Sequence, residues 1–392
     1  MALIPIQIAF LIVCWITALV TLVIFLEGWF ALTHRSRLSA ARSSGDSGPV
    51  TVLVPFQNDP DTLRRTIRSI LGQSYPFVEL VLIYSEAGHG HGMVAREFSA
   101  ARSPVSVRPL KVSFRLDSAA NRIRALEQAK PVVRGSWILV VDSDVALEPH
   151  AIESALEFAR DQDITALGLT PGVECRSFVQ KLVGPSLEWF VRMMRVVDRG
   201  RERSSRVHPA AAFMLFHGDT HSVINRMNRM PGILNESGWT LWSYRVEGLR
   251  TFYGDGSGWI FRDATPRSLF SRIQSGSAVH GGRRTTAFLV GSGAIAVVSV
   301  LGVLVGLSGP AGSLVTHGIL YLSAFSYSLM ATSYFFYARR LKAAAWFAPF
   351  WFLAHGWALL LVVAELGRSK PSAQDVTVLS GRDSGSEVST RK

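Results

Sequence analysis

Long apolar runs at both ends of the chain set the first limit on its fold. Leu3 to Leu26 is almost continuously apolar, and about 20 such residues cross a hydrocarbon core of roughly 30 Å. Three runs near the other end contain no Lys, Arg, Asp or Glu: Ala287 to Leu307, Leu314 to Tyr337 and Ala343 to Ala364. We therefore predict one amino-terminal and about three carboxyl-terminal transmembrane helices, with buried core helices as the alternative.

The basic residues beside these runs predict how the chain crosses the membrane. No Lys or Arg precedes Leu3, whereas a cleaved signal peptide would begin with positive residues, so the first helix should stay attached. Basic residues follow this helix within 34–42, precede the second at 283–284, and separate the third from the fourth at 339–342. Because positive flanks stay cytoplasmic, we predict an inner or plasma membrane protein with an external amino terminus and a cytoplasmic middle region.

The net charge of +12 would also suit a nucleic-acid-binding protein. The excess basic residues, however, flank the apolar runs or cluster between Arg192 and Arg206, where anionic lipid headgroups would attract them. The lipid bilayer is thus the predicted partner, and nucleic acid is not. Cys14 and Cys175 are too few and too far apart in sequence for a disulfide framework or a zinc site.

The middle region alternates between strand and helix patterns. Interleaved strands and helices predict an open parallel α/β sheet, whose ligands bind at the carboxyl ends of the strands. Asn58, Glu86 and Asp142 each fall just past such an end. The predicted strands are Val50 to Pro55, Val78 to Tyr84, Val105 to Phe114 and Ser136 to Val141, with helices from Asp61 and over Ala119 to Ala129.

An acidic pair follows the last of these strands. Asp142 and Asp144, separated by Ser143, come directly after a wholly apolar run. Carboxylate oxygens of this kind hold Mg²⁺ or Mn²⁺, and Mg²⁺ is usually bound by one or two carboxylates together with substrate phosphates. The pair predicts a metal site that takes a diphosphate, with a solvated turn as the alternative.

Three motifs together resemble family 2 glycosyltransferases of the GT-A (Rossmann-like) fold. They are Pro55 to Asn58, Gln73 to Pro76 (QSYP) and Asp142 to Asp144, and the resemblance covers about residues 50 to 280. The single first helix, the sequence VELVLIYSE and the carboxyl-terminal apolar runs look most like ceramide glucosyltransferase and related lipid glycosyltransferases. The resemblance implies a nucleotide-sugar donor, Mg²⁺ or Mn²⁺, and a membrane lipid acceptor.

The resemblance also implies roles for individual donor-site residues. It puts Glu86 near the nucleoside, Asp142 near the ribose or diphosphate, and Asp144 on the metal. Arg122 stands where the family often has a lysine, so its charge would suit a phosphate, although a surface helix arginine is the alternative. The expected donor-binding set is Pro55, Asn58, Glu86, Arg122 and Asp142, and the expected metal ligands are Asp144 and Asp142.

The general base is where the sequence departs from the family pattern. Inverting transfer needs a group that takes the proton of the acceptor hydroxyl, and a carboxylate is the usual solution. The family uses the Asp of a Glu-Asp pair, but the matching stretch here is Glu236 followed by Ser237. We assign Glu236 as the base, with Asp255 as a weaker substitute.

A second departure concerns the family motif Gln-x-x-Arg-Trp. Here it reads Leu269 to Ile273, and Arg272 is retained without the Trp. Arg272 would neutralise the diphosphate as it leaves. Because the Trp helps processive synthases to hold a growing chain, its absence favours transfer of a single sugar.

The sequence thus predicts a membrane-bound inverting glycosyltransferase that moves one sugar to a lipid. The alternatives are a catalytically silent membrane partner, favoured by Ser237, and a processive polysaccharide synthase. The basic amphipathic stretch Phe178 to Arg195 would lie in the membrane interface or pack as a core helix. The predicted divisions are a helix at 1–33, a linker at 34–48, the GT-A domain at 49–265, an interfacial segment at 266–285, three helices at 286–366 and a disordered tail at 367–392.

Overall fold

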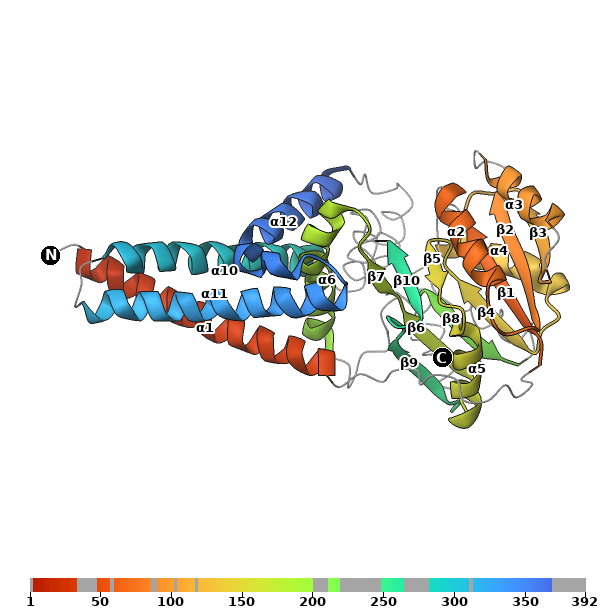
Figure 1. The fold of residues 1–392 in the computed structure, drawn as a ribbon, viewed down its shortest axis with the longest axis horizontal. Helices are drawn as coiled ribbons and strands as arrows, with labels where there is room; N and C mark the ends of the chain where they lie inside the picture. The colour runs from red at the N-terminus through yellow and green to blue at the C-terminus, as the bar shows by residue number, and fades with distance from the viewer. Residues whose placement is uncertain are drawn as a thin grey trace, which may run out of the picture.

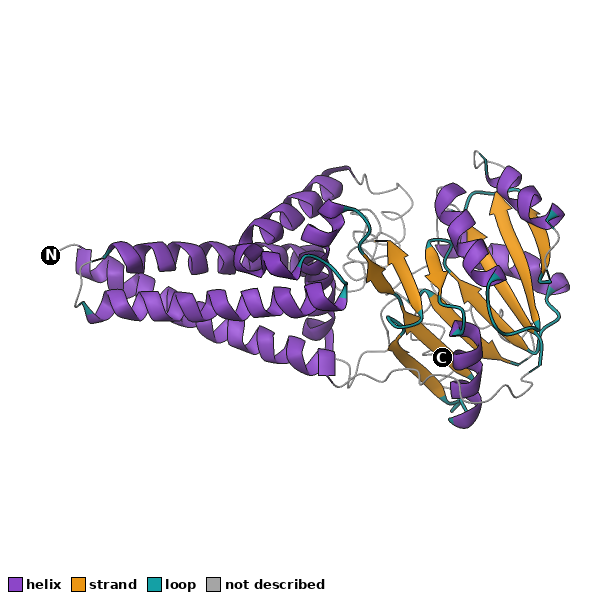
Figure 2. Ribbon diagram, viewed as in Figure 1, coloured by secondary structure: helices purple, strands orange, loops and turns teal. Residues whose placement is uncertain are grey.

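The computed structural model shows an elongated chain with an apolar helix bundle beside an α/β sheet domain (Figure 1). Figure 2 shows that the bundle is entirely helical, whereas the strands gather in the other half. The residues that the structure describes are 3–33, 48–56, 60–85, 90–101, 104–116, 119–199, 211–218, 248–263, 282–309 and 313–368.

A seven-stranded sheet in the order β3-β2-β1-β4-β8-β6-β9 forms the centre of the α/β domain. β1 pairs in parallel with β2 and β4, as predicted, whereas β8 runs antiparallel between β4 and β6. The strands are β1 (Val50–Phe56), β2 (Val78–Ser85), β3 (Ser106–Val112), β4 (Trp137–Val141), β6 (Ala166–Thr170), β8 (Phe213–His217) and β9 (Thr251–Asp255).

The four predicted strands run parallel to one another, as expected, and β8 adds an antiparallel strand beside them. Between β6 and β8 the chain forms α6 (Phe178–Arg199), which packs against the helix bundle instead of crossing a face of the sheet. Among the described residues that connect β6 to β8, no helix crosses the sheet, and β8 begins beside Val141 at the carboxyl end of β4. The amide of Asp142, at that edge, donates a hydrogen bond of 3.0 Å to the carbonyl of Ala212 just before β8.

Helices cover both faces of the sheet, which explains why β4 is apolar throughout and β1 is apolar except for Thr51. Val52 and Val54 of β1 pack into one hydrophobic cluster together with α2, α3 and α5, whereas Leu53 packs into another with α4. Every residue of β1 and β4 is buried. The helices are α2 (Pro60–Leu71), α3 (His91–Ala100), α4 (Ala119–Ala129) and α5 (Ala151–Asp161), with a 3-10 turn η1 (Lys130–Val132) after α4.

A small second sheet lies next to the acidic pair. It has the order β5-β10-β7, with β10 antiparallel to β5 and parallel to β7. β5 begins at Val145, directly after Asp144, so this sheet places β10 beside the acids. The strands are β5 (Val145–Leu147), β7 (Gly172–Glu174) and β10 (Ile260–Asp263).

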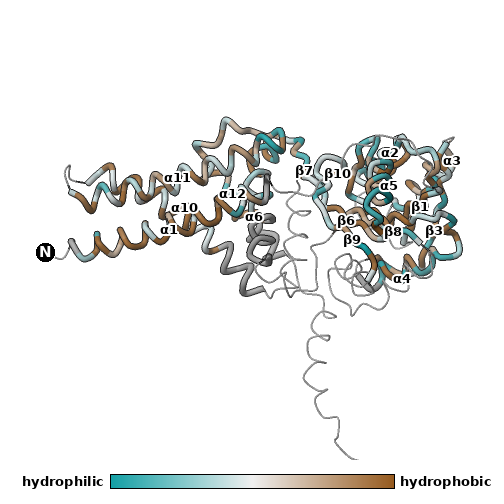
Figure 3. Tube along the Cα trace, turned by 90° about the horizontal axis from the view of Figure 1, so that it is seen from below, coloured by the Kyte–Doolittle hydropathy of each residue, from teal (hydrophilic) through white to brown (hydrophobic). Residues whose placement is uncertain are grey.

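Three helices of the bundle are long and apolar enough to cross a membrane: α1 (Leu3–Thr33), α10 (Gly282–Ser308) and α11 (Leu314–Arg340). Apolar residues recur along all three (Figure 3). Many large apolar side chains point outward, such as Trp15, which is 58% exposed, and Leu304, which is 57% exposed. An apolar surface of this kind suits contact with lipid better than with water.

The last predicted span is shorter than the other three. It consists of a 3-10 turn η2 (Ala345–Phe350) that contains Pro349, followed by α12 (Trp351–Arg368), with an apolar stretch over Ala345–Leu361. Figure 1 shows α12 beside α6 at the end of the bundle nearest to the sheet domain.

α6 joins the α/β domain to the bundle. Its buried side chains Leu187 and Phe190 pack in one cluster with Tyr337 of α11 and Trp351 of α12. Of the two interpretations of this segment, packing as a core helix describes the residues from Val183 to Phe190, whereas Phe178 is 67% exposed. The side chains beyond Phe190 lie outside the described residues. Ser177 and Gln180 form a reciprocal capping box at its start.

Pro185, inside α6, leaves one backbone carbonyl of this helix able to accept a hydrogen bond from the bundle. Proline has no amide hydrogen, so the carbonyl of Lys181, four residues earlier, has no donor within the helix. The amide of Ala344, just after α11, donates to this carbonyl at 3.2 Å. The hydroxyl of Tyr334 donates to the carbonyl of Leu182 at 2.6 Å. The helix-breaking residue thus supports the contact between the two halves of the molecule.

An ion pair provides a second connection. Arg340, at the end of α11, lies 2.6 Å from the carboxylate of Asp255 at the end of β9, and it also contacts Ser257. The two side chains are 18% and 10% exposed, so little solvent screens the pair.

We expect D255N and R340Q each to destabilise the full-length protein, since each leaves a nearly buried charge unpaired. The double variant should lose less unfolding free energy than the two single variants lose together, with a coupling free energy of about 0.5 to 3 kcal/mol. Thermal unfolding of the four proteins in neutral detergent measures this cycle. Strictly additive losses would show that the pair does not connect the two halves.

Candidate active site

The Asp142–Asp144 tripeptide lies at the carboxyl end of β4, and neighbouring elements fix its backbone. The hydroxyl of Thr66 on α2 donates a hydrogen bond of 2.8 Å to the carbonyl of Ser143. The Ser143 side chain is buried, whereas the carboxylates of Asp142 and Asp144 are 24% and 21% exposed. The two acids can therefore meet a ligand that arrives at this edge of the sheet.

Two arginines hold the acidic pair. Nη2 of Arg122, from α4, lies 2.7 Å from Oδ1 of Asp142. Nη2 of Arg262, from β10, lies 2.6 Å from Oδ2 of Asp142 and 2.8 Å from Oδ1 of Asp144. Arg262 is buried and bridges both acids. The resulting cluster of two carboxylates and two guanidinium groups is electrically balanced.

The surroundings move the pKa values of the two acids in opposite directions. Burial raises the pKa of Asp142, but the charges and hydrogen bonds of Arg122 and Arg262 outweigh it and leave this pKa below its ordinary value. Burial is also the largest effect on Asp144; Arg262 opposes it and the nearby Asp142 adds to it, so the pKa of Asp144 is raised. For Arg262, burial lowers the pKa, but Asp144 and Asp142 raise it further and keep the guanidinium charged.

The lowered pKa of Asp142 predicts a specific loss of stability in acid. Its ionised form contributes stability above the unfolded pKa of about 3.9, and this contribution is lost as the pH falls through the lower folded pKa. D142N should therefore unfold at a lower temperature than wild type near neutral pH, and the difference should shrink on acidification. Thermal unfolding against pH in detergent tests this, with the exposed D163N as the control. A difference that grows in acid would contradict the assignment.

The residues present fit a divalent cation in part. Oδ1 of Asp144 is buried and lies 2.8 Å from Nη2 of Arg262, in an ion pair without hydrogen-bond geometry, so a cation would share this oxygen with Arg262. Within the described ranges no group of three His, Cys, Asp or Glu gathers to hold a metal. Two carboxylates nevertheless suffice where substrate phosphates complete the shell, as is usual for Mg²⁺.

The structure brings together three of the predicted site residues. Arg122, Asp142 and Asp144 form one cluster. Pro55 lies in β1, in register with Ile83 of β2, near the carboxyl end of the same sheet. Four predicted residues lie outside the described residues: Asn58, Glu86, Glu236 and Arg272.

Asp255, the weaker candidate for the general base, is held by other groups. Its carboxylate pairs with Arg340 at 2.6 Å and accepts a hydrogen bond from the amide of Ser257. A carboxylate in an ion pair with a nearly buried arginine is a weak base, so Glu236 remains the predicted base.

Arg262 is the site residue that the sequence analysis missed. It stands in the segment WIFRD, where a single arginine follows apolar residues. The one available signal was this charge directly after the apolar residues Ile260 and Phe261, because a buried arginine needs an acidic partner. Its partners lie 118 and 120 residues earlier, and the strand order of the small sheet is what brings them together.

A mixed α/β sheet with paired acids at its carboxyl edge, and a small second sheet beside them, is the arrangement of a GT-A-fold glycosyltransferase. The family model described as "Glycosyltransferase like family 2" matches residues 48–274, more than half of the chain. The chain therefore belongs to this family and is a glycosyltransferase, which confirms the predicted family and fold class.

Solved structures give more distant matches. A mannosyltransferase from Pyrobaculum calidifontis, in complex with GDP-Man and Mn²⁺, is 14% identical with a TM-score of 0.45, over 84% of this chain and 98% of that one. TarS of S. aureus is 12% identical with a TM-score of 0.37, over 79% of this chain and 53% of that one. TarS 1-349 in complex with UDP-GlcNAc is 12% identical with a TM-score of 0.38, over 80% and 89%. No curated protein matches the chain.

Proposed function

We propose that this glycosyltransferase moves one sugar, with inversion, from a nucleotide diphosphate sugar to a lipid that reaches the site from the bilayer. The observation that supports it is the acidic pair Asp142 and Asp144, which is held at the carboxyl edge of the sheet in a domain joined through α6 to long apolar helices. Ligands of open α/β sheets bind at this edge.

The donor would bind across the ends of β1, β2 and β4, where the predicted residues Pro55, Asn58 and Glu86 belong. Asp144, together with Asp142, would hold Mg²⁺ or Mn²⁺ against the diphosphate. The cation would supply positive charge that stabilises the departing diphosphate. Arg122 lies close enough to Asp142 to contact the same phosphates.

Transfer would proceed in one displacement. The acceptor hydroxyl oxygen attacks the anomeric carbon while the carboxylate of Glu236 takes its proton. The bond from the anomeric carbon to the diphosphate oxygen breaks, and the nucleoside diphosphate leaves with the electron pair. Arg272 would stabilise the charge on this leaving group.

The proposed topology is a multi-pass protein of the inner or plasma membrane with a cytoplasmic catalytic domain. In the sequence, basic residues follow α1 at 34–42, and α11 ends with Arg339 and Arg340. α1 begins at the far end of the bundle from that domain (Figure 1). A cytoplasmic transferase domain joined to several membrane helices would suit an enzyme of glycolipid synthesis, as in ceramide glucosyltransferase-like enzymes.

Release of nucleoside diphosphate tests the proposal. Full-length protein in detergent is supplied with Mn²⁺, a lipid extract and, in turn, UDP-glucose, UDP-galactose, UDP-N-acetylglucosamine and GDP-mannose. We expect turnover with wild type and its loss in E236Q, with E157Q on α5 as the control. Donor binding without turnover on any extract would favour the silent membrane partner that Ser237 suggests. Product chains of many sugars would favour the processive synthase.

A further inference from the structure

The segment that follows α11, residues 343–368, does not run the length of the bundle. α10 and α11 contain 27 residues each and meet at the end far from the sheet domain, whereas η2 and α12 stay at the near end (Figure 1). Pro349 lies within the apolar stretch Ala345–Leu361 of this segment. As one straight helix the stretch would be about 26 Å long, which is less than the hydrocarbon core of roughly 30 Å.

Contacts with α11 show how far the segment enters the bundle. The carbonyl of Pro349 accepts a hydrogen bond from the hydroxyl of Tyr327, and the ring of Trp351 lies 6.0 Å from the ring of Tyr327. Tyr327 lies 13 residues before the end of α11, or about 20 Å along that helix. The chain has therefore reached this depth where α12 begins.

Contacts with α10 show that α12 goes no deeper. His355 is hydrogen-bonded to the backbone of Ser292, and an added Cβ at Gly293 would lie 3.3 Å from Cδ1 of Leu359. Both positions on α10 lie 10 or 11 residues after its start, or about 15 Å. A helix that crossed to the far end would meet α10 about 6 Å further along after four residues. Instead, the carboxyl end of α12 lies toward the sheet domain (Figure 1).

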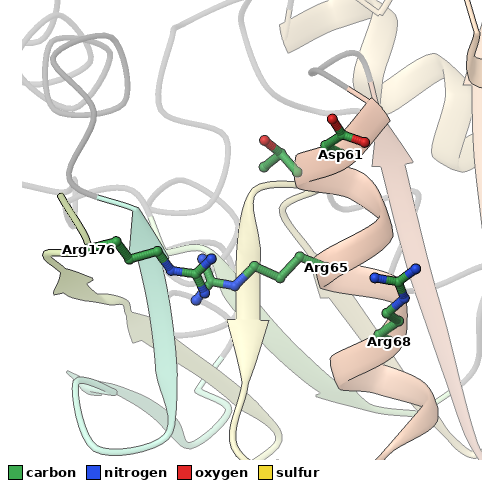
Figure 4. Close-up of a pocket in the computed structure, with 5 residues that line it drawn as sticks. Asp61, Arg65, Arg68 and Arg176 are labelled. Carbon is green, nitrogen blue, oxygen red and sulfur yellow. The ribbon is translucent and has the colours of Figure 1, made fainter.

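α6, on which α12 packs, is tied to the sheet domain where it begins. Glu174 contacts both Arg65 of α2 and Arg176, and Figure 4 shows the two arginine side chains reaching toward each other. Further along α6, the ring of Phe190 lies 4.4 Å from the ring of His355. Segment 343–368 is thus held at the sheet domain's end of the bundle.

One face of the segment is apolar and exposed. The opposite face packs in the bundle through Trp351, Ala354 and Ala358. No charged residue occurs from Ala343 to Ala364. An exposed apolar stripe of this kind needs cover, and acyl chains also suit the adjoining outer faces of α10 and α11. Five large side chains at helical spacing form the stripe, each between 50% and 68% exposed: Trp346, Phe350, Leu353, Trp357 and Leu360.

Basic residues on both sides of the segment agree with a return. Arg339 and Arg340 precede it, and Arg368 and Lys370 stand at its end. Positive flanks of membrane segments stay on the cytoplasmic side. A hairpin keeps both basic pairs on that side, whereas a fourth span would put the second pair outside.

We propose that residues 343–368 form a re-entrant hairpin whose exposed stripe lies among the acyl chains of the leaflet on the side of the sheet domain. The described chain then crosses the membrane three times, and the tail that follows lies on the same side as the catalytic domain. This rests on the membrane topology of the proposed function, and it puts a hairpin in place of the third carboxyl-terminal span.

Accessibility of single cysteines tests the return of the chain. The full-length variants are D161C at the exposed end of α5, L314C at the exposed start of α11, and S372C after α12. Each meets a membrane-impermeant maleimide in intact and in opened cells, with wild type as the blank because its two cysteines are buried. We expect L314C to react in intact cells, and D161C and S372C only in opened cells.

The labelling pattern separates the hairpin from the topology on which it rests. If S372C reacts under the same conditions as L314C, while D161C differs from both, the chain crosses a fourth time and the hairpin is wrong. If D161C and L314C react alike, α10 and α11 do not cross the membrane, and the proposed topology and the hairpin fail together.

Quenching by lipid tests what covers the stripe. L360C is labelled with bimane and reconstituted into vesicles of brominated phosphatidylcholine, beside L304C on the outer face of α10 and D161C on the sheet domain. We expect quenching at L360C to equal that at L304C, with none at D161C. An unquenched L360C would show that a protein surface, such as a second copy of the chain, covers the stripe. Neither experiment uses a donor sugar, so a catalytically silent protein would give the same results.

Discussion

R262Q is expected to lower the free energy of unfolding by about 3 to 5 kcal/mol, because it leaves two largely buried carboxylates without the cation that bridges them. Nη2 of Arg262 lies within 2.8 Å of both Asp142 and Asp144. Thermal unfolding of the full-length protein in detergent measures the loss. The matched control is R108Q. Arg108 is 31% exposed, against 10% for Arg262, and lies 3.8 Å from Glu79, so a loss of about 1 kcal/mol or less is expected.

Mn²⁺ should restore part of the stability that R262Q loses. A divalent cation bound between Asp142 and Asp144 replaces the missing positive charge, and a ligand that binds the folded state raises its stability. The rise in melting temperature with Mn²⁺ should therefore be larger for R262Q than for wild type. If R262Q loses no more unfolding free energy than R108Q does, Arg262 does not hold the two acids. If Mn²⁺ leaves the melting temperature of R262Q unchanged, no metal binds at this pair.

D144N is expected to lower kcat/KM for the nucleotide sugar by about 100-fold to 1000-fold, as loss of a group that stabilises leaving-group charge typically does. The amide keeps the shape of the side chain but removes the charge that would hold the metal. Release of nucleoside diphosphate with Mn²⁺ measures this, and melting temperature confirms folding.

The matched control for D144N is D163N. Asp163 is 92% exposed and adopts a positive φ of 51°, a conformation that Asn also accepts, so its variant should keep wild-type activity. If D144N retains activity within about threefold of wild type, a factor that is well under 1 kcal/mol, the assignment of Asp144 to the metal is wrong.

Local sequence patterns predicted the parts of the structure that depend on residues close together in the sequence. The run Val50 to Pro55 became β1, buried throughout, and the helix predicted over Ala119 to Ala129 is α4. Such patterns can be recognised because burial on both faces requires continuous apolar residues, and helix packing requires apolar residues at helical spacing. The placement of Asp142 at a strand end followed from the same pattern.

These local patterns could not predict contacts between residues that lie far apart in the sequence. The partners of Arg262 and Arg340 lie 120 and 85 residues away from them, and no local periodicity reports such pairings. The same holds for Pro185, which reads as a helix breaker in sequence, whereas in the fold it leaves a carbonyl for Ala344.

The sequence by itself determined the apolar helices, the α/β class, the family and the position of the acidic pair, since each depends on composition or spacing within a short window. The tertiary structure decided the direction of β8, the use of Arg262 to bridge Asp142 and Asp144, and the joining of α6 to the bundle. These features depend on which distant segments of the chain come into contact. Where such segments bury charged side chains, the charges have to be paired, and this selects the side chains that lie together.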